Sequence, residues 1–288
     1  KMKRLNFVWL LLILCFAASS APAQTEKRAL KSKFAAFGGV KVHYNDVGKG
    51  KNALVFVHGW TCSADFWRQS VDEFPNYRVV ALDLPGHGMS DKPRADYSME
   101  YFAKSVEAVL KDAGIKKAVL VGHSMGTPVI RQFYRLYPEK TLGLIIVDGA
   151  LRPMGTKQQE QQYLAFLRAD YKANAPKMVD GMLQPITDEK LRREIRSAML
   201  ATPEHVAVSA MAGMTDEKIW ANDKIDVPVL AILAQSPFWK PDTADFYRRL
   251  APNLDFRMWQ GVSHFLMMER PQVFNQSVRF FVEKNKLL

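Results

Sequence analysis

The residue types that could do chemistry gather first at residues 122–126, Gly-His-Ser-Met-Gly, which form a G-x-S-x-G pattern. The apolar run just before them predicts a buried strand, and the segment from about residue 125 has a helical pattern. A strand that turns sharply into a helix exposes the serine on the bend as a nucleophile. We therefore interpret Ser124 as a candidate nucleophile, although a plain strand–helix connection would also explain the two glycines.

A serine hydroxyl is a weak nucleophile and needs a base. Of the six histidines, His264 comes just after the last predicted strand, and the carboxyl ends of parallel strands are where such sheets place their chemistry. His58 and His87 lie in glycine turns and are interpreted as loop braces, and His123 belongs to the bend itself. We expect a reaction rate that rises with pH as His264 loses its proton.

Two backbone N–H groups could stabilise the oxyanion that forms during attack by Ser124. The N–H of Met125 lies at the start of the predicted helix, with the helix dipole behind it. Trp60 follows His58-Gly59 at the end of another predicted strand, so its N–H could face the same oxygen. Core packing is a second role for Trp60, compatible with the first.

The elements that must position these residues alternate between strands and helices, which predicts a parallel sheet with helices on both faces. Residues 34–151 and 223–288 form the two parts of this α/β core, and residues 152–222 contain only helical patterns and predict a cap. The core begins with a hairpin at 34–48. The other expected strands are 52–59, 77–88, 117–122, 142–149, 227–233 and 254–259, and the expected core helices are 64–74, 98–115, 125–137, 243–250 and 271–284.

The N-terminal residues have the order of a bacterial signal peptide. Positive residues come first, residues 7–18 are apolar, and Ala21-Pro22-Ala23 forms an A-x-A cleavage site. The apolar run is shorter than the roughly 20 residues that span a membrane. We expect residues 1–23 to be removed, residues 24–33 to be a linker, and the protein to be periplasmic or extracellular with no stable membrane anchor.

Composition excludes several function classes. The formal net charge is +11, but the basic residues are scattered and no nucleic-acid motif accompanies them, so we expect no nucleic-acid partner. The chain has two cysteines, and Cys15 lies in the signal peptide. Cys62 therefore stays unpaired, and we expect it to be buried and inert. We expect no metal and no cofactor, and the sequence leaves the oligomeric state open.

The motifs together resemble the α/β-hydrolase family over residues 34–285. They are VHGW, DLPGHGMSDKP, LVGHSMGTPV, IIVDGA and GVSHFLMMERP, in the order that the family has. The resemblance implies a mostly parallel eight-stranded sheet with a helical cap inserted after strand 6. It also implies Ser124 as nucleophile, His264 as general base and acid, and Trp60 and Met125 as the oxyanion-hole amides.

One departure from the family concerns the triad acid, which relatives usually carry in a G-x-x-D turn after the strand at 227–233. Here Ala234-Gln235-Ser236-Pro237 stand in that place and hold no carboxylate. Asp148 matches the position that some dehalogenases and lipases of the fold use, although it could simply cap the turn at Gly149. The alternative acid is Asp242, or its neighbour Asp245, from a lengthened loop.

The resemblance also implies the reaction class. Haloalkane dehalogenases and epoxide hydrolases of this fold have aspartate at the bend, whereas serine favours acyl transfer to water. We expect a secreted carboxylesterase-like serine hydrolase whose small-molecule substrate is a small or medium apolar ester, thioester or lactone. Alternatives are a C–C bond hydrolase and a slow or non-catalytic ligand-binding protein. Phe238, Trp239 and Phe265 are expected to line the substrate site.

Overall fold

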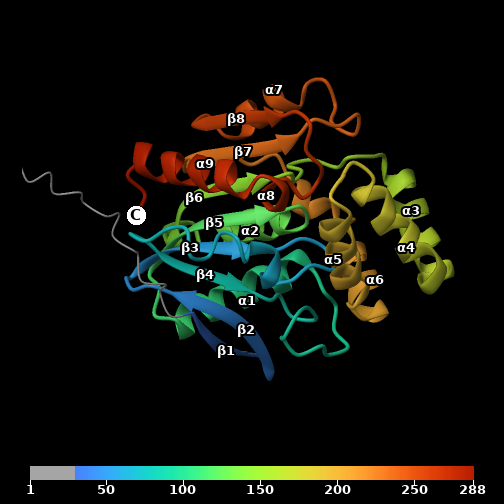
Figure 1. Ribbon diagram of the computed structural model, residues 1–288, viewed down its shortest axis with the longest axis horizontal. Helices are drawn as coiled ribbons and strands as arrows, with labels where there is room; N and C mark the ends of the chain where they lie inside the picture. Colours follow the sequence, from blue (N-terminus) through green and yellow to red (C-terminus); the bar gives the residue numbers. More distant parts are fainter. Residues whose placement is uncertain (1–29) are drawn as a thin grey trace, which may run out of the picture.

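The computed structural model describes residues 30–288 and joins eight strands into one sheet, in the order β1-β2-β4-β3-β5-β6-β7-β8 (Figure 1). The predicted signal peptide lies outside the described residues. The pairs β1–β2 and β2–β4 are antiparallel, and the pairs from β4 to β8 are parallel. The strands are β1 (Lys31–Phe37), β2 (Val40–Val47), β3 (Asn52–Val57), β4 (Arg78–Leu82), β5 (Lys117–His123), β6 (Thr141–Val147), β7 (Val229–Ala234) and β8 (Leu254–Trp259).

The central strands are buried on both faces. Five consecutive residues of β3 and all six of β7 are buried, as expected for parallel strands covered by helices on both sides. The chain order reverses beside β3, whose neighbours are β4 on one side and β5 on the other. Such a reversal opens a crevice at the carboxyl ends of the strands, where ligands of α/β sheets bind.

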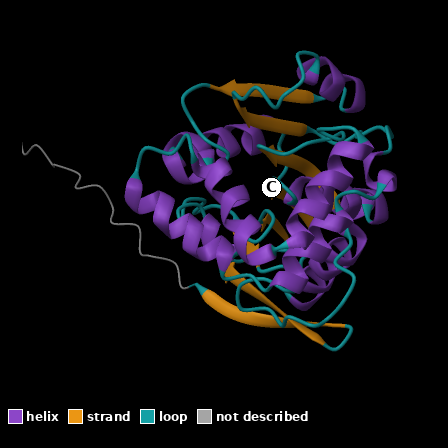
Figure 2. Ribbon diagram, turned by 90° about the vertical axis from the view of Figure 1, so that its right-hand side faces the viewer, coloured by secondary structure: helices purple, strands orange, loops and turns teal. Residues whose placement is uncertain are grey.

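Helices cover both faces of the sheet (Figure 2). Helix α1 (Met99–Asp112) begins at Ser98, whose side chain accepts a hydrogen bond from the N–H of Tyr101. It packs against α2 (Gly126–Leu136). Helix α9 (Pro271–Lys284) packs against the segment that follows β3, through the rings of Trp67 and Phe274. The shorter core helices are η1 (Ala64–Trp67), η2 (Pro138–Lys140), α7 (Thr243–Leu250) and α8 (Leu266–Glu269).

Between β6 and β7 the chain forms a helical cap, which lies beyond the carboxyl ends of the parallel strands (Figure 1). Its helices are α3 (Lys157–Ala169), α4 (Tyr171–Leu183), α5 (Glu189–Leu200), α6 (Glu204–Gly213) and η3 (Glu217–Trp220). Helix α6 is tied to the core because the indole N–H of Trp60 donates to the carbonyl of Ala207 at 2.8 Å. The predicted α/β fold with a cap after the sixth strand is confirmed.

Two local expectations were wrong. Residues 64–74 do not form one helix: η1 ends at Trp67 and turns follow. Phe66 and Trp67 are both buried although they are adjacent in sequence, so tertiary packing overrides the helical propensity of this segment. The linker also ends earlier than residue 33, because β1 begins at Lys31 and pairs with β2, and Lys33 binds Asp46 at 2.8 Å.

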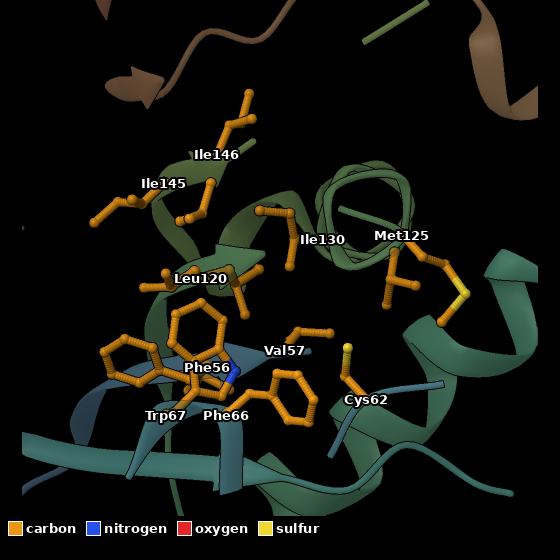
Figure 3. Packing of buried hydrophobic residues seen from close by; sticks show 14 of the residues in the cluster. Phe56, Val57, Cys62, Phe66, Trp67, Leu120, Met125, Ile130, Ile145 and Ile146 are labelled. Carbon is orange, nitrogen blue, oxygen red and sulfur yellow. The ribbon is translucent and has the colours of Figure 1, made fainter. Parts of the chain in front are cut away.

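The core packs tightly behind the carboxyl ends of β3 and β5 (Figure 3). Cys62 belongs to this core (Figure 3), and burial raises the pKa of its thiol. A protonated, buried thiol is inert. Across residues 30–288, no helix has the length and hydropathy to cross a membrane. The same residues hold no group of three or more side chains suited to a metal ion.

Candidate active site

Ser124 occupies a strained bend between β5 and α2. Its φ is +51°, a conformation that side chains other than glycine rarely adopt. The flanking glycines allow the bend: a Cβ on Gly122 would lie 2.5 Å from the carbonyl oxygen of Gly126, and one on Gly126 would lie 2.5 Å from that of Val57. The sequence thus builds a nucleophile elbow with Ser124 partly exposed at its tip.

The structure brings Asp148 and His264 together. Asp148 follows the last residue of β6, and its Oδ2 lies 2.6 Å from Nδ1 of His264. Its Oδ1 accepts the N–H of Ala234 at 2.7 Å. Because a carboxylate only accepts hydrogen bonds, Nδ1 of His264 carries the proton and Nε2 is left as the basic nitrogen.

The imidazole of His264 lies beside the elbow. Its ring centroid is 4.7 Å from that of His123, the residue directly before Ser124. Val147, directly before Asp148, pairs with His123 across the sheet. In the described chain the Ser124 hydroxyl and His264 are not hydrogen-bonded to each other, and catalytic hydrogen bonds commonly tighten only when substrate binds.

The alternative acid lies elsewhere. The carboxylate of Asp242 is bound by both terminal nitrogens of Arg152 and is half exposed. That guanidinium holds the pKa of Asp242 below its usual value. Asp245 pairs with Arg248. The turn after β7 holds no carboxylate, and Asp148 is instead oriented by the backbone N–H of Ala234, the last residue of β7.

Two backbone N–H groups near the elbow are free to meet a substrate oxygen. Within residues 30–288, neither the N–H of Trp60 nor that of Met125 donates to a protein acceptor. The loop that carries Trp60 is strained, with Thr61 at φ +55°. Met125 immediately precedes α2, so the helix dipole also favours negative charge there. The pair could serve as an oxyanion hole.

Comparison with known proteins decides the family. A family model described as alpha/beta hydrolase fold matches residues 52–179, and this span includes the elbow. The solved structure of a thermophilic esterase is 26% identical and superposes with a TM-score of 0.71, over 89% of this chain and 99% of that one. The chain belongs to the α/β-hydrolase fold family.

Two curated proteins are also similar over most of this chain and most of their own length. A 2-hydroxy-6-oxononadienedioate/2-hydroxy-6-oxononatrienedioate hydrolase of Paraburkholderia phymatum is 29% identical over 84% of this chain and 91% of its own length. A non-heme chloroperoxidase of Streptomyces lividans is 27% identical over 85% of this chain and 97% of its own length. These proteins differ in their named reactions, so the likeness identifies this chain as an α/β hydrolase without fixing its substrate.

His123, which the sequence places only in the bend, contacts the candidate base directly. Its Nε2 donates to the backbone carbonyl of His264 at 2.8 Å. Burial and the neighbouring His264 push the pKa of His123 well below its usual value, so it stays neutral beside an imidazole that must accept a proton. Its contact depends on a loop 141 residues away, and the sequence carries no signal for it.

We expect His123→Phe to lower kcat by about 10-fold or more with little change in KM, because the ring packing stays but the hydrogen bond that places His264 is lost. His123→Gln can still donate and should recover most of the rate. Steady-state kinetics on both variants, with urea midpoints as the folding control, make the comparison. Equal losses in the two variants would mean that His123 only fills space.

The loop of His264 has a second support from Glu269. Its carboxylate accepts hydrogen bonds from both the backbone N–H, at 2.7 Å, and the hydroxyl of Ser263. The Ser263 hydroxyl oxygen accepts the N–H of Phe265 at 3.0 Å. The residues on both sides of His264 are therefore fixed, which orients the imidazole toward the elbow.

The three residues expected to line the substrate site have different surroundings. Phe265 is fully buried, with its ring against His264 and His123, so we assign it to the support of the base. Phe238 is 76% exposed. Trp239 is half-buried, and its indole donates to the carbonyl of Ala234. Phe238 and Trp239 line a small depression together with Arg152 and Met154.

A larger cavity of about 530 Å³ lies where the cap meets the loop after β4. Its charged lining comes from Arg94 and Asp96 of that loop and from Arg168 and Glu204 of the cap. None of the residues discussed above as nucleophile, base or acid belongs to its lining. The complete lining is Arg94, Asp96, Arg168, Glu204, His205, Val208, Ser209 and Ala212.

The lowered pKa values of three buried histidines predict how the free energy of unfolding depends on pH. Burial lowers the pKa of His58 and His123, and it lowers that of His87 to about 3. In the unfolded chain they titrate near 6.5, so below that pH the unfolded state binds more protons and stability falls as pH decreases. We expect the free energy of unfolding to be lower at pH 5.5 than at pH 7.5, by up to about 4 kcal/mol for three such groups.

Urea unfolding at several pH values measures this slope. His87→Gln removes one of the three groups and should weaken the pH dependence by up to about 1.4 kcal/mol between pH 7.5 and pH 5.5. A free energy of unfolding that does not change between pH 7.5 and 5.5 would show that these side chains are accessible to protons in the folded protein.

Proposed function

We propose that this α/β hydrolase is an exported serine esterase that cleaves small or medium apolar esters, thioesters or lactones through an acyl-enzyme on Ser124. The observation that carries the proposal is the 2.6 Å hydrogen bond from His264 to Asp148 beside a serine held at positive φ. A nucleophile next to a base that a third group orients is the signature of covalent acyl transfer.

In the proposed reaction Ser124 Oγ attacks the carbonyl carbon of the substrate while its proton moves to Nε2 of His264. The oxyanion is stabilised by the N–H groups of Trp60 and Met125, each of which is worth about 10²–10³ in rate. Asp148 stabilises the imidazolium. His264 then donates the proton to the leaving alcohol or thiol, and in the second half it activates the water that hydrolyses the acyl-serine.

The geometry favours Asp148 over Asp242 as the acid. Asp148 has 7% of its side chain exposed and both of its oxygens engaged, one by His264 and one by Ala234. Asp242 is engaged by Arg152 and half exposed. A buried carboxylate interacts more strongly with an imidazolium than an exposed, already paired one does. Asp148 is therefore part of the proposal, and Asp242 is not.

The test combines a covalent probe with a substrate panel. A fluorophosphonate should label Ser124, and p-nitrophenyl esters of increasing acyl length should be hydrolysed with a burst of one p-nitrophenol per active site. His264→Ala is the matched control, because it keeps the nucleophile and removes the base. Tight ligand binding without labelling or turnover would instead support the ligand-binding alternative.

A C–C bond hydrolase is the second candidate, because the curated relative from Paraburkholderia phymatum carries that kind of name. The discriminating substrate is a 2-hydroxy-6-oxo-dienoate, whose cleavage is followed by loss of its absorbance. If its kcat/KM exceeds that of every ester by 10-fold or more, the esterase assignment is replaced. The reverse ratio supports the ester as the physiological class.

Export is the part of the proposal that rests on residues 1–23 and their signal-peptide pattern. Expression of the full chain in a Gram-negative host should yield periplasmic protein whose mass corresponds to a start at Gln24. Mass spectrometry of the periplasmic and cytoplasmic fractions measures this. Intact protein that stays in the cytoplasm would contradict export while leaving the catalytic proposal untouched.

A further inference from the structure

A second hydrogen-bonded series of serine, histidine and aspartate side chains lies apart from Ser124. The hydroxyl oxygen of Ser32 on β1 is 2.9 Å from Nε2 of His43 on β2. Nδ1 of His43 is 2.7 Å from Oδ2 of Asp83, the residue that follows β4. His43 and Asp83 are both 3% exposed, whereas Ser32 is exposed. A hydroxyl that solvent can reach is therefore joined to a buried, oriented imidazole.

Asp83 sets the tautomer of His43. Its carboxylate also accepts the backbone N–H groups of Ala64, at 2.7 Å, and Met89, at 2.9 Å. Burial alone would raise the pKa of Asp83, but these hydrogen bonds and that of His43 lower it. An ionised carboxylate only accepts, so Nδ1 of His43 carries the proton and Nε2 accepts the Ser32 hydroxyl.

The geometry of the β1–β2 hairpin brings the side chain of Ser32 next to that of His43. Phe34 pairs with His43 in the register of β1 and β2, and Ser32, two residues earlier, points to the same face of the sheet. The ring of Phe34 lies 5.2 Å from that of His43 and holds it from the side. The imidazole is thus fixed by an aromatic ring, a carboxylate and the hydroxyl itself.

We propose that Ser32 is a second covalently modifiable serine, which takes an acyl group from activated esters or a phosphonyl group from fluorophosphonates. Ser32 Oγ attacks the carbonyl carbon or phosphorus, and its proton passes to Nε2 of His43. The bond to the leaving group breaks, giving acyl- or phosphonyl-Ser32 and a phenolate or fluoride, and His43 releases its proton to solvent. This site is independent of the function proposed for Ser124.

Ser32 lies on an edge strand and has neither the helix start nor the Trp60 loop that surround Ser124. We therefore expect Ser32 to be modified at least about 10²-fold more slowly than Ser124, which is the rate factor that one oxyanion-hole donor contributes. The product should persist, so each chain takes one group at this site without turnover. Long exposure to a fluorophosphonate would then label two serines per chain.

The experiment uses the Ser124→Ala protein and a fluorophosphonate, with peptide mapping by mass spectrometry over time. Ser32 should be labelled at least 10-fold faster than Ser197, an exposed serine on α5 with no histidine hydrogen-bonded to it among residues 30–288. Adding Ser32→Ala, a change at an exposed position whose urea midpoint checks the fold, should remove that label. Labelling of Ser124 in the wild type is read separately, so the two proposals can fail independently.

The role of the base is tested by His43→Phe in the same Ser124→Ala background, with the urea midpoint as evidence of folding. Labelling of Ser32 should fall at least 10-fold. If that variant does not fold, His43→Gln, which fills a similar space without a basic nitrogen, takes its place. Labelling of Ser32 at the rate of Ser197, or labelling that survives loss of His43 in a folded variant, would overturn the proposal.

Discussion

Asp148→Asn is expected to lower kcat by about 10⁴-fold while the fold stays intact. The reason lies in the two partners of this side chain. Oδ1 accepts the N–H of Ala234 and Oδ2 accepts from His264, so an asparagine must keep its oxygen toward Ala234 and turn its NH₂ toward the imidazole. The NH₂ donates to Nδ1, which selects the tautomer with the proton on Nε2, and that nitrogen can no longer accept the proton of Ser124.

The matched control is Asp242→Asn. It removes one charge from the exposed pair with Arg152, and such pairs contribute little to stability, so kcat should stay within about 3-fold of the wild type. Burst kinetics on a p-nitrophenyl ester, with urea midpoints for both variants, complete the comparison. If Asp242→Asn lost the activity and Asp148→Asn kept it, the acid would belong to the loop after β7.

Ser124→Ala is expected to have the largest effect, a loss of about 10⁶ in kcat, with no burst and no acyl-enzyme detectable by intact mass. Alanine keeps the backbone of the elbow but removes the only atom that can become acylated there. The residual rate over water would come from the oxyanion donors and from substrate binding.

The size of that residual rate is informative. Chromatographically homogeneous Ser124→Ala protein should be assayed together with the double variant Ser124→Ala/His264→Ala, because residues that act as one unit lose activity non-additively. The second substitution should cost less than 10-fold more. A Ser124→Ala protein that retains more than 1% of kcat would show that the reaction does not pass through this hydroxyl.

Much of the fold and part of the candidate site could be predicted because their signals are local. The elbow is five adjacent residues, and the strands β7 and β8 and the helices α7 and α9 follow short apolar patterns that the structure reproduces to within two residues. The alternation of strands and helices then limits how the sheet can be ordered. This part of the prediction needed no knowledge of long-range contacts.

The remaining features depend on contacts that sequence patterns do not encode. Asp148 and Asp242 could not be separated from the sequence, because the choice depends on a hydrogen bond that spans 116 residues and on the pairing of Arg152 with Asp242. Phe265 follows the base directly and was expected to line the pocket, but the turn points it inward. The hydrogen bond of His123 to the loop of His264 likewise follows from tertiary packing alone.

The position of Asp148 at the end of β6 has a consequence for how this enzyme could diverge. The last residue of β7, Ala234, orients Asp148 through its backbone N–H, and a backbone N–H is supplied by any residue type except proline. Residues 235–242 can therefore accept insertions and replacements without altering the charges around the imidazole. That freedom makes this segment a natural place for evolution, or for an engineer, to change substrate preference while the reaction chemistry is conserved.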